Sequence, residues 1–150
     1  MGYIDANLMK GERVVYRTKL HWIVFLWPII FIILAFVFFA SGKETAILGT
    51  LFFLIAILSA ALAFISLKTS EFGVTNKRVL IKVGFIRRNS LETLLQKVEG
   101  IQVNQGILGR IFNYGTILIK GTGGTSNPFH KIEAPMEFRK KVQEQIASIQ

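Results

Sequence analysis

Five basic residues close together in the sequence are the strongest candidates for a binding site: Lys77, Arg78, Lys82, Arg87 and Arg88. Side chains alternate between the two faces of a strand, so Arg78 and Lys82 would share one face, with Lys77 beside the preceding turn. Basic groups placed in this way can bind anionic lipid headgroups or a protein partner. The alternative is that these charges only solvate a strand and fix the orientation of the chain in a membrane.

Motifs for catalysis, or for a metal or cofactor, are not found in the sequence. The chain has no cysteine, and its two histidines, His21 and His130, are far apart without a nearby second ligand. The glycine-rich residues 121–126 lack the lysine and the following helix of a phosphate-binding loop, so we interpret them as a connection between strands. The sequence therefore predicts a protein that is not an enzyme and has no cofactor.

The net charge of +9 indicates an anionic neighbour such as lipid headgroups, nucleic acid or an acidic protein. Aromatic residues of the second half occupy apolar strand positions and do not alternate with the basic ones as base-stacking platforms would. We therefore expect membrane lipids and a protein partner or a homo-oligomer, and no nucleic acid.

Two long apolar runs, residues 22–40 and 46–67, contain no charged side chain. The first would extend roughly 28 Å as a helix, which matches the hydrocarbon core of a bilayer. The link SGKET between the runs is so short that the two helices must form an antiparallel hairpin. A cleaved signal peptide fits poorly, because the first run is too long and Phe38 breaks the small-residue pattern before Ala40.

Basic residues flank the hairpin on both sides, whereas the link contains Lys43 as its one basic residue. Cytoplasmic segments of membrane proteins are enriched in Lys and Arg, so both termini are expected in the cytoplasm. The sequence predicts a multi-pass membrane protein with both termini in the cytoplasm. Its parts would be a cytoplasmic N-terminal segment (1–21), a transmembrane hairpin (22–67) and a cytoplasmic domain (68–150).

Small residues recur on one face of the second apolar run: Ala56, Ser59, Ala60 and Ala63. Such a face lets another helix approach closely. The partner helix would be either the first helix of the same hairpin or a helix of another protein.

Residues 69–134 change to the period of two that is typical of strands. Alternation predicts strands at residues 71–74 and 78–83, a turn at Thr75-Asn76, and a third strand from Phe85. Further strands are expected at 98–103, with a bulge at Gly100, at 114–121 and at 129–134. An amphipathic helix with Pro135 at its first position and an apolar stripe through Phe138 and Val142 closes the chain at about 135–149.

Three stretches of this region, VTNKRVLIKVG (74–84), LLQKVEGIQVNQGILGRIFNYGTILIKGTGG (94–124) and the helix opening PMEF (135–138), carry a family resemblance. The chain resembles the bacterial pleckstrin-homology (PH) domain family of small membrane proteins, in the YdbS-like layout with two apolar helices ahead of the domain. The resemblance implies a seven-stranded sandwich or partly open barrel of two antiparallel sheets with a C-terminal helix. Because periodicity gives six strands, we expect the seventh in residues 85–95. The resemblance also implies that the membrane is the bacterial cell (inner) membrane, and it does not imply an enzyme.

Two functional hypotheses follow from these observations. In the first, the chain is a membrane adaptor or scaffold whose cytoplasmic PH-like domain binds a protein or anionic lipid at the inner leaflet. In the second, it is an accessory subunit of a larger membrane complex, such as a transporter or respiratory assembly, held through the small-residue face of the second helix.

Overall fold

The computed structural model describes residues 2–84, 89–124 and 126–149 of the chain. The chain divides into two compact units: a helical unit, Trp22–Lys68, and a β-rich unit made of Met1–His21 together with Thr69–Gln150. The β-rich unit is therefore built from two pieces of sequence, and the helical unit is inserted between them.

The helical unit is the predicted hairpin. A 3-10 turn η1 (Trp22–Phe25) leads into helix α2 (Leu26–Ala40), and a second turn η2 (Lys43–Thr45) leads into helix α3 (Ala46–Thr69). Within the described residues, two helical segments, Trp22–Ala40 and Lys43–Thr69, are long and apolar enough to cross a membrane. Pro28 lies in the first turn of α2, where a missing N–H is tolerated better than in the middle of a helix.

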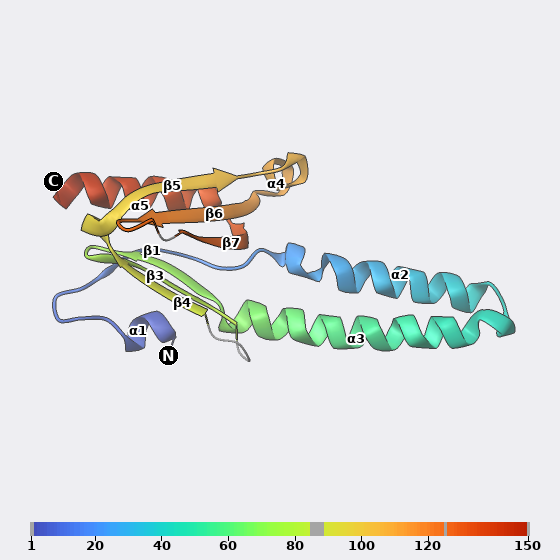
Figure 1. Ribbon diagram of the computed structural model, residues 1–150. Helices are drawn as coiled ribbons and strands as arrows, with labels where there is room; N and C mark the ends of the chain where they lie inside the picture. The colour runs from blue at the N-terminus through green and yellow to red at the C-terminus, as the bar shows by residue number, and fades with distance from the viewer. Residues whose placement is uncertain (1, 85–88, 125, 150) are drawn as a thin grey trace. The chain divides into compact units, whose positions relative to one another are not determined.

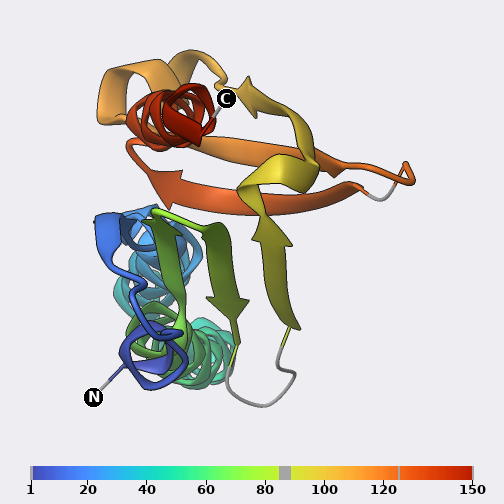
Figure 2. The same ribbon diagram turned by 90° about the vertical axis from the view of Figure 1, so that its left-hand side faces the viewer.

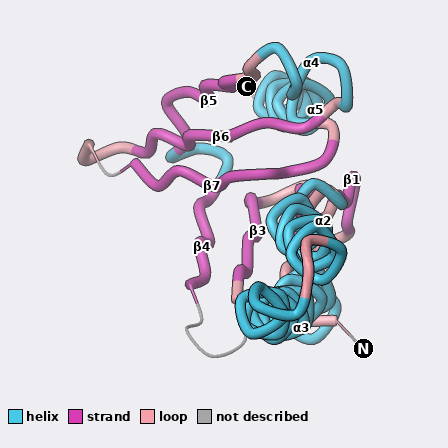
Figure 3. Tube along the Cα trace, turned by 90° about the vertical axis from the view of Figure 1, so that its right-hand side faces the viewer, coloured by secondary structure: helices cyan, strands magenta, loops and turns pink. Residues whose placement is uncertain are grey.

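Helices α2 and α3 lie side by side in the hairpin (Figure 3). The ring of Phe52 stacks on that of Phe38, with centroids 5.4 Å apart. Near the link, a Cβ atom on Gly49 would lie 2.8 Å from the ring of Phe39 and 3.1 Å from the carbonyl oxygen of Ala35. The missing side chain of Gly49 is therefore what allows the two backbones to approach closely here.

The β-rich unit contains two antiparallel sheets, with seven strands among the described residues (Figures 1 and 2). The first sheet has the order β1-β2-β3-β4, and the second has the order β5-β6-β7. The strands of the first sheet are β1 (Val14–Thr18), β2 (Glu71–Thr75), β3 (Arg78–Val83) and β4 (Asn89–Leu94). Those of the second are β5 (Val98–Asn104), β6 (Tyr114–Gly121) and β7 (Ser126–Glu133).

In its described residues, the β-rich unit also contains four helical elements: α1 (Tyr3–Ala6), η3 (Leu95–Lys97), α4 (Ile107–Phe112) and α5 (Pro135–Ile149). Helix α5 begins at Pro135, as predicted, and buries Phe138 and Val142. Phe72 of β2 and Phe129 of β7 meet edge to face, with ring centroids 6.2 Å apart, and so join the two sheets in the core. This is the sandwich with a C-terminal helix that the sequence predicted.

The position of the seventh strand was predicted wrongly. We expected it in residues 85–95, but the additional strand is β1, which precedes the hairpin and pairs with β2 after it. Residues 89–94 form the third predicted strand, β4, and its expected start at Phe85 lies outside the described residues. Tyr16 pairs with Val74, and Thr18 pairs with Phe72. The predicted N-terminal lead-in thus contributes an edge strand to the sheet.

The segment after β1 crosses from the first sheet to the second. Leu20 forms a bridge with Ile132 of β7, and the N–H of His21 donates to the carbonyl oxygen of Lys131 over 2.8 Å. The hydroxyl of Thr18 also donates to the carbonyl oxygen of Glu133 over 2.6 Å. Residues 14–21 therefore close one corner between the sheets.

Two local predictions can be compared with the strand pairing. The β2–β3 turn consists of Asn76 and Lys77, one residue later than predicted. The Thr75 hydroxyl accepts hydrogen bonds of 3.1 and 3.0 Å from the N–H groups of Lys77 and Arg78. The register of β5 against β6 shifts between Val98 and Gly100. The predicted bulge at Gly100 is thus confirmed.

Candidate binding surfaces

The predicted basic face of β3 is covered by the N-terminal segment. Leu80, which lies between Arg78 and Lys82 on this face, is fully buried. Ile4 of α1 is also buried, and its Cδ1 atom lies 2.6 Å from where a Cβ atom on Gly73 would be. The lack of a side chain at Gly73 makes room for α1 on this side of the sheet.

Helix α1 is attached to the sheet by charged groups as well as by Ile4. The carboxylate of Glu71 accepts hydrogen bonds of 2.9 and 3.0 Å from the backbone N–H groups of Tyr3 and Ile4. Asp5 forms an ion pair with Arg17 of β1. The face that sequence alternation assigned to solvent therefore has a protein layer on it.

Arg78 belongs to a buried network within the domain. Its Nε donates to Oε1 of Glu12 over 3.0 Å, and its Nη1 donates to Oε2 of Glu92 over 2.6 Å. Its Nη2 also donates to the carbonyl oxygen of Asn7. The side chain of Arg78 is 10% exposed and that of Glu12 is 0% exposed. Arg78 therefore fixes the N-terminal segment and does not take part in an exposed basic cluster.

The surroundings of Glu12 favour its charged form. Burial by itself would raise the pKa of this carboxyl group, but hydrogen bonds from Arg78, from the N–H of Met9 and from the hydroxyl of Thr75 outweigh it. The pKa of Glu12 is consequently lowered, and that of Arg78 is raised, first by its hydrogen bond to Glu12. Both groups stay ionised at neutral pH, as a paired buried charge requires.

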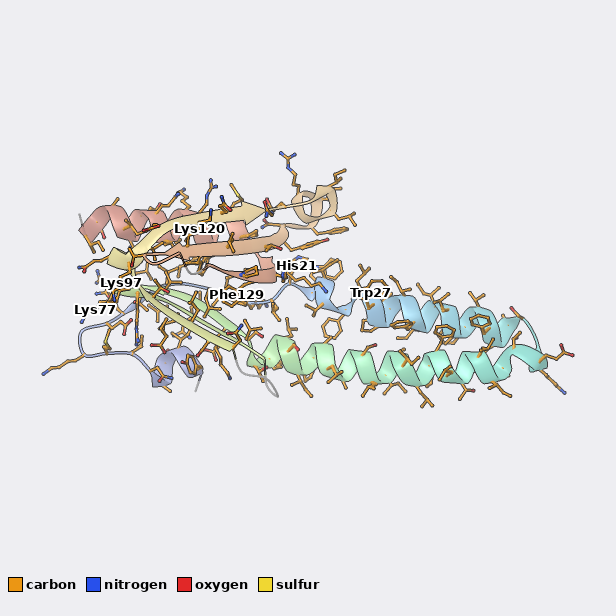
Figure 4. The ribbon with its side chains drawn as sticks, viewed as in Figure 1. His21, Trp27, Lys77, Lys97, Lys120 and Phe129 are labelled. Atoms are coloured by element: carbon orange, nitrogen blue, oxygen red, sulfur yellow. The ribbon has the colours of Figure 1, made fainter. Side chains whose placement is uncertain are left out.

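Lys77 and Lys82 lie at opposite ends of the β2–β3 hairpin. Lys82 pairs with Glu71, the first residue of β2, which is separated from the end of α3 by Ser70 alone. Lys77 is exposed in the turn at the other end, with Nζ donating to the carbonyl oxygen of Lys10 over 2.9 Å. Figure 4 places Lys77 beside Lys97, at the opposite end of the β-rich unit from His21. Five residues of strand separate the two lysines by about 16 Å.

Three of the five predicted binding residues are described by the structure. Of these three, Lys82 lies at the end of the β-rich unit where the chain connects to the hairpin. Its Nζ is 5.8 Å from the ring centroid of Tyr3, and the side chain is half-buried. Arg87 and Arg88 lie outside the described residues. The binding of lipid or of a partner by these side chains stays a prediction.

Comparison with known proteins agrees with this architecture. The sequence profile described as bacterial PH domain matches residues 22–146, which is most of the chain. The chain belongs to the bacterial PH domain family. No curated protein and no solved structure matches it. The resemblance seen in the sequence is thus confirmed, and membership indicates a membrane-associated or binding domain of a generally non-catalytic kind.

The small-residue face of α3 points into the hairpin of this PH-domain protein. Ala56 is fully buried, as is Ala35 of α2, while Ser59, Ala60 and Ala63 are half-buried. Ala56 is therefore occupied within the hairpin. Contact of this face with a helix of another protein stays a prediction for Ala60 and Ala63.

The two histidines occupy separate places in the PH domain. His21 is buried, with its ring 5.2 Å from that of Tyr114. The ring of His130 is exposed on β7 and shares a hydrogen bond of 3.0 Å with the hydroxyl of Thr116. Among the described residues, no group of three or more His, Cys, Asp or Glu side chains could hold a metal ion.

Two features of the domain were missed in the sequence. Glu12 gave no signal, because a single acidic residue in a polar lead-in does not reveal a partner 66 residues later. Helix α4 could have been found from Ile107, Leu108 and Ile111, which fall on one side of a short helix that begins inside the QGILGR segment. These three side chains are all exposed.

Proposed function

We propose that this chain is a non-enzymatic membrane adaptor. The hairpin crosses the bacterial cell membrane, and the PH domain binds a protein partner or anionic lipid at the cytoplasmic face. The observation that carries the proposal is the insertion of an apolar hairpin between two paired strands of the domain, β1 and β2.

This insertion attaches the domain to the hairpin at two points. Lys19, Leu20 and His21 separate β1 from the helical segment that begins at Trp22, and Ser70 separates α3 from β2. A chain spans at most about 3.6 Å per residue, so both connections are short. Since Thr18 pairs with Phe72, the two connections leave the first sheet at the same end of the paired strands. A domain held in this way stays at the membrane surface, as an adaptor requires.

Charge supports the cytoplasmic placement. Basic residues precede and follow the hairpin, and Lys43 in the link has Glu44 beside it. Both domain segments would therefore lie on the cytoplasmic side. A dedicated role as a subunit of a larger complex is the weaker candidate, because Ala56 of the small-residue face is already buried in the hairpin.

Cysteine labelling tests the topology, because the natural chain has no cysteine. Ser41→Cys lies between the helices, and Gln143→Cys lies on the exposed side of α5. In intact bacterial cells we expect a membrane-impermeant maleimide to label Ser41→Cys, and to label Gln143→Cys after permeabilisation. Labelling of both variants in intact cells, or of neither, would show the topology to be wrong.

Extraction in mild detergent tests the adaptor role. We expect the chain to recover a sub-stoichiometric protein partner or bound anionic lipid, and to run as a separate species once these are removed. A stable stoichiometric complex with subunits of a transporter or respiratory assembly would contradict the adaptor proposal in favour of the accessory-subunit hypothesis.

A further inference from the structure

Helix α4 has an exposed apolar surface that the PH domain itself does not use. The exposed fractions are 82% for Ile107, 53% for Leu108 and 67% for Ile111. Clustered apolar side chains on a protein surface mark a binding site for another protein or for a membrane. We call these three side chains the α4 apolar surface.

The opposite side of α4 is firmly packed. Gly109 is buried, and a Cβ atom there would lie 2.5 Å from the carbonyl oxygen of Tyr114. The side-chain amide of Gln105 donates to the carbonyl oxygens of Gly109 and Tyr114 over 3.4 and 3.2 Å. Helix α4 is thus fixed against the start of β6, and its orientation directs the apolar surface outward.

Helix α4 lies at the end of the domain from which the chain continues into the hairpin. The carbonyl oxygen of Asn113, directly after α4, accepts a hydrogen bond of 3.1 Å from the N–H of Ala134. The next residue, Tyr114, has its ring 5.2 Å from that of His21. His21 is the residue before Trp22, where the apolar helical segment begins. These contacts within the domain therefore place the α4 apolar surface near His21, after which the chain continues into the hairpin.

Exposed basic residues accompany this surface. Arg110 lies within α4, and Lys19 and Lys131 lie in the two segments that pair beside His21. Glu133, the acidic residue among them, is half-buried. Apolar side chains with basic neighbours are typical of segments that lie in the interface of a membrane with anionic lipids.

We propose that the α4 apolar surface inserts into the cytoplasmic headgroup region of the same bilayer that the hairpin crosses. This inference rests on the proposed function, because it requires the hairpin to be in the membrane. It adds a third point of attachment, outside the basic β3 residues, and so fixes the orientation of the domain on the membrane.

Fluorescence quenching of the full chain in anionic nanodiscs tests this proposal. Leu108→Cys and Ile111→Cys are each labelled with an environment-sensitive nitrobenzoxadiazole dye, and lipids with a spin label near the headgroup serve as quenchers. We expect blue-shifted emission at both positions and the loss of most of its intensity with the quencher. Gln143→Cys on the exposed side of α5 is the matched control and should keep water-like, unquenched emission.

A dye at Leu54→Cys in α3, where the natural side chain is 60% exposed, reports on the hairpin separately. If lipids with a deeper spin label do not quench this dye, the hairpin is outside the membrane and the proposed function fails. If they quench it while positions 108 and 111 behave like Gln143→Cys, the α4 proposal is wrong and the proposed function stands. Blue-shifted but unquenched emission at positions 108 and 111, together with disulfide cross-linking between unlabelled Leu108→Cys copies, would identify an interface between chains. That result would also overturn the α4 proposal.

Discussion

The guanidinium group of Arg78 and the carboxylate of Glu12 form a buried ion pair, with Nε and Oε1 3.0 Å apart across 66 residues of sequence. The whole hairpin lies between them in the chain. The pair therefore joins the N-terminal piece of the PH domain to the piece that follows the hairpin. Together with the pairing of β1 and β2, it makes the two pieces one folding unit.

Substitution of Glu12→Gln should destabilise the PH domain by about 3 kcal/mol, because removal of one partner leaves the buried charge of Arg78 poorly compensated. Urea unfolding of the full chain in mild detergent, followed by the loss of strand signal in circular dichroism, measures this change. Asp5→Asn is the matched control, because it also removes an acidic partner of an arginine, Arg17, but in an exposed pair. Equal effects of the two variants would contradict the role given to Glu12.

The stability of the domain should fall on acidification because of Glu12. Its pKa in the folded protein is lowered, so the unfolded chain binds a proton at a higher pH than the folded chain does. The stabilisation is complete above the ordinary pKa of a glutamate, about 4.3, and is lost as the pH falls through the lowered value. Unfolding free energies measured from pH 7 down to pH 3 should show a smaller decline for Glu12→Gln than for the natural chain.

The sequence predicted the elements whose signals are local. The apolar runs 22–40 and 46–67 are uninterrupted, so they predicted the end of α2 at Ala40 and the start of α3 at Ala46, whereas residues 22–25 form the 3-10 turn η1 and α3 continues to Thr69. Pro135 and the stripe through Phe138 and Val142 did the same for α5. In these cases a continuous apolar run, or apolar residues at helical spacing, leaves a pattern in consecutive residues.

The features missed in the sequence depend on contacts between distant segments. β1 is five residues long, and its partner β2 follows after the whole hairpin, so nothing near Tyr16 indicates a sheet. Arg78 was expected on a solvated face, because alternation distinguishes two faces of a strand without showing what covers the second. The covering residues, Ile4 and Glu12, belong to a polar segment with no period of its own.

Residues 69–150 should not fold by themselves, because this fragment lacks β1 and leaves Arg78 without Glu12. A chain in which residues 22–68 are replaced by a flexible linker of about 12 residues, long enough to join His21 to Thr69, should give a folded soluble domain. Dispersed amide signals in NMR spectra would identify the folded protein. A dispersed spectrum from the 69–150 fragment would show that β1 is dispensable.

Substitution of Ala56→Leu should destabilise the hairpin, whereas Ala61→Leu should have little effect. Ala56 is fully buried, so the larger side chain would force α2 and α3 apart, at a cost of about 1 to 3 kcal/mol. Ala61 is exposed on another side of the same helix and receives the same change. Thermal unfolding of helical signal in detergent compares the two variants. Similar midpoints would mean that Ala56 is not held against α2.

Binding of anionic vesicles by the linker-joined domain should depend on Lys82 more than on Lys77. Lys82 lies opposite Glu71 at the hairpin end of the strands, whereas Lys77 lies in the distant turn. A basic residue near an anionic surface contributes about 1 kcal/mol, so Lys82→Glu should weaken binding roughly tenfold or more. Lys77→Glu makes the same change in net charge. Lys77 lies about 16 Å from Lys82 along the strand, which is beyond the Debye length of about 8 Å, so its effect on binding at the hairpin end is screened.

Vesicle co-sedimentation at 0.15 M salt, a concentration near physiological ionic strength, separates these outcomes. Lys82→Met is the control for packing, because it keeps contact with the ring of Tyr3 and removes one charge, so it should give about half the free-energy change of Lys82→Glu. Equal losses for Lys77→Glu and Lys82→Glu would indicate attraction by net charge without a fixed orientation. Unchanged binding in both variants would exclude lipid recognition by Lys77 and Lys82.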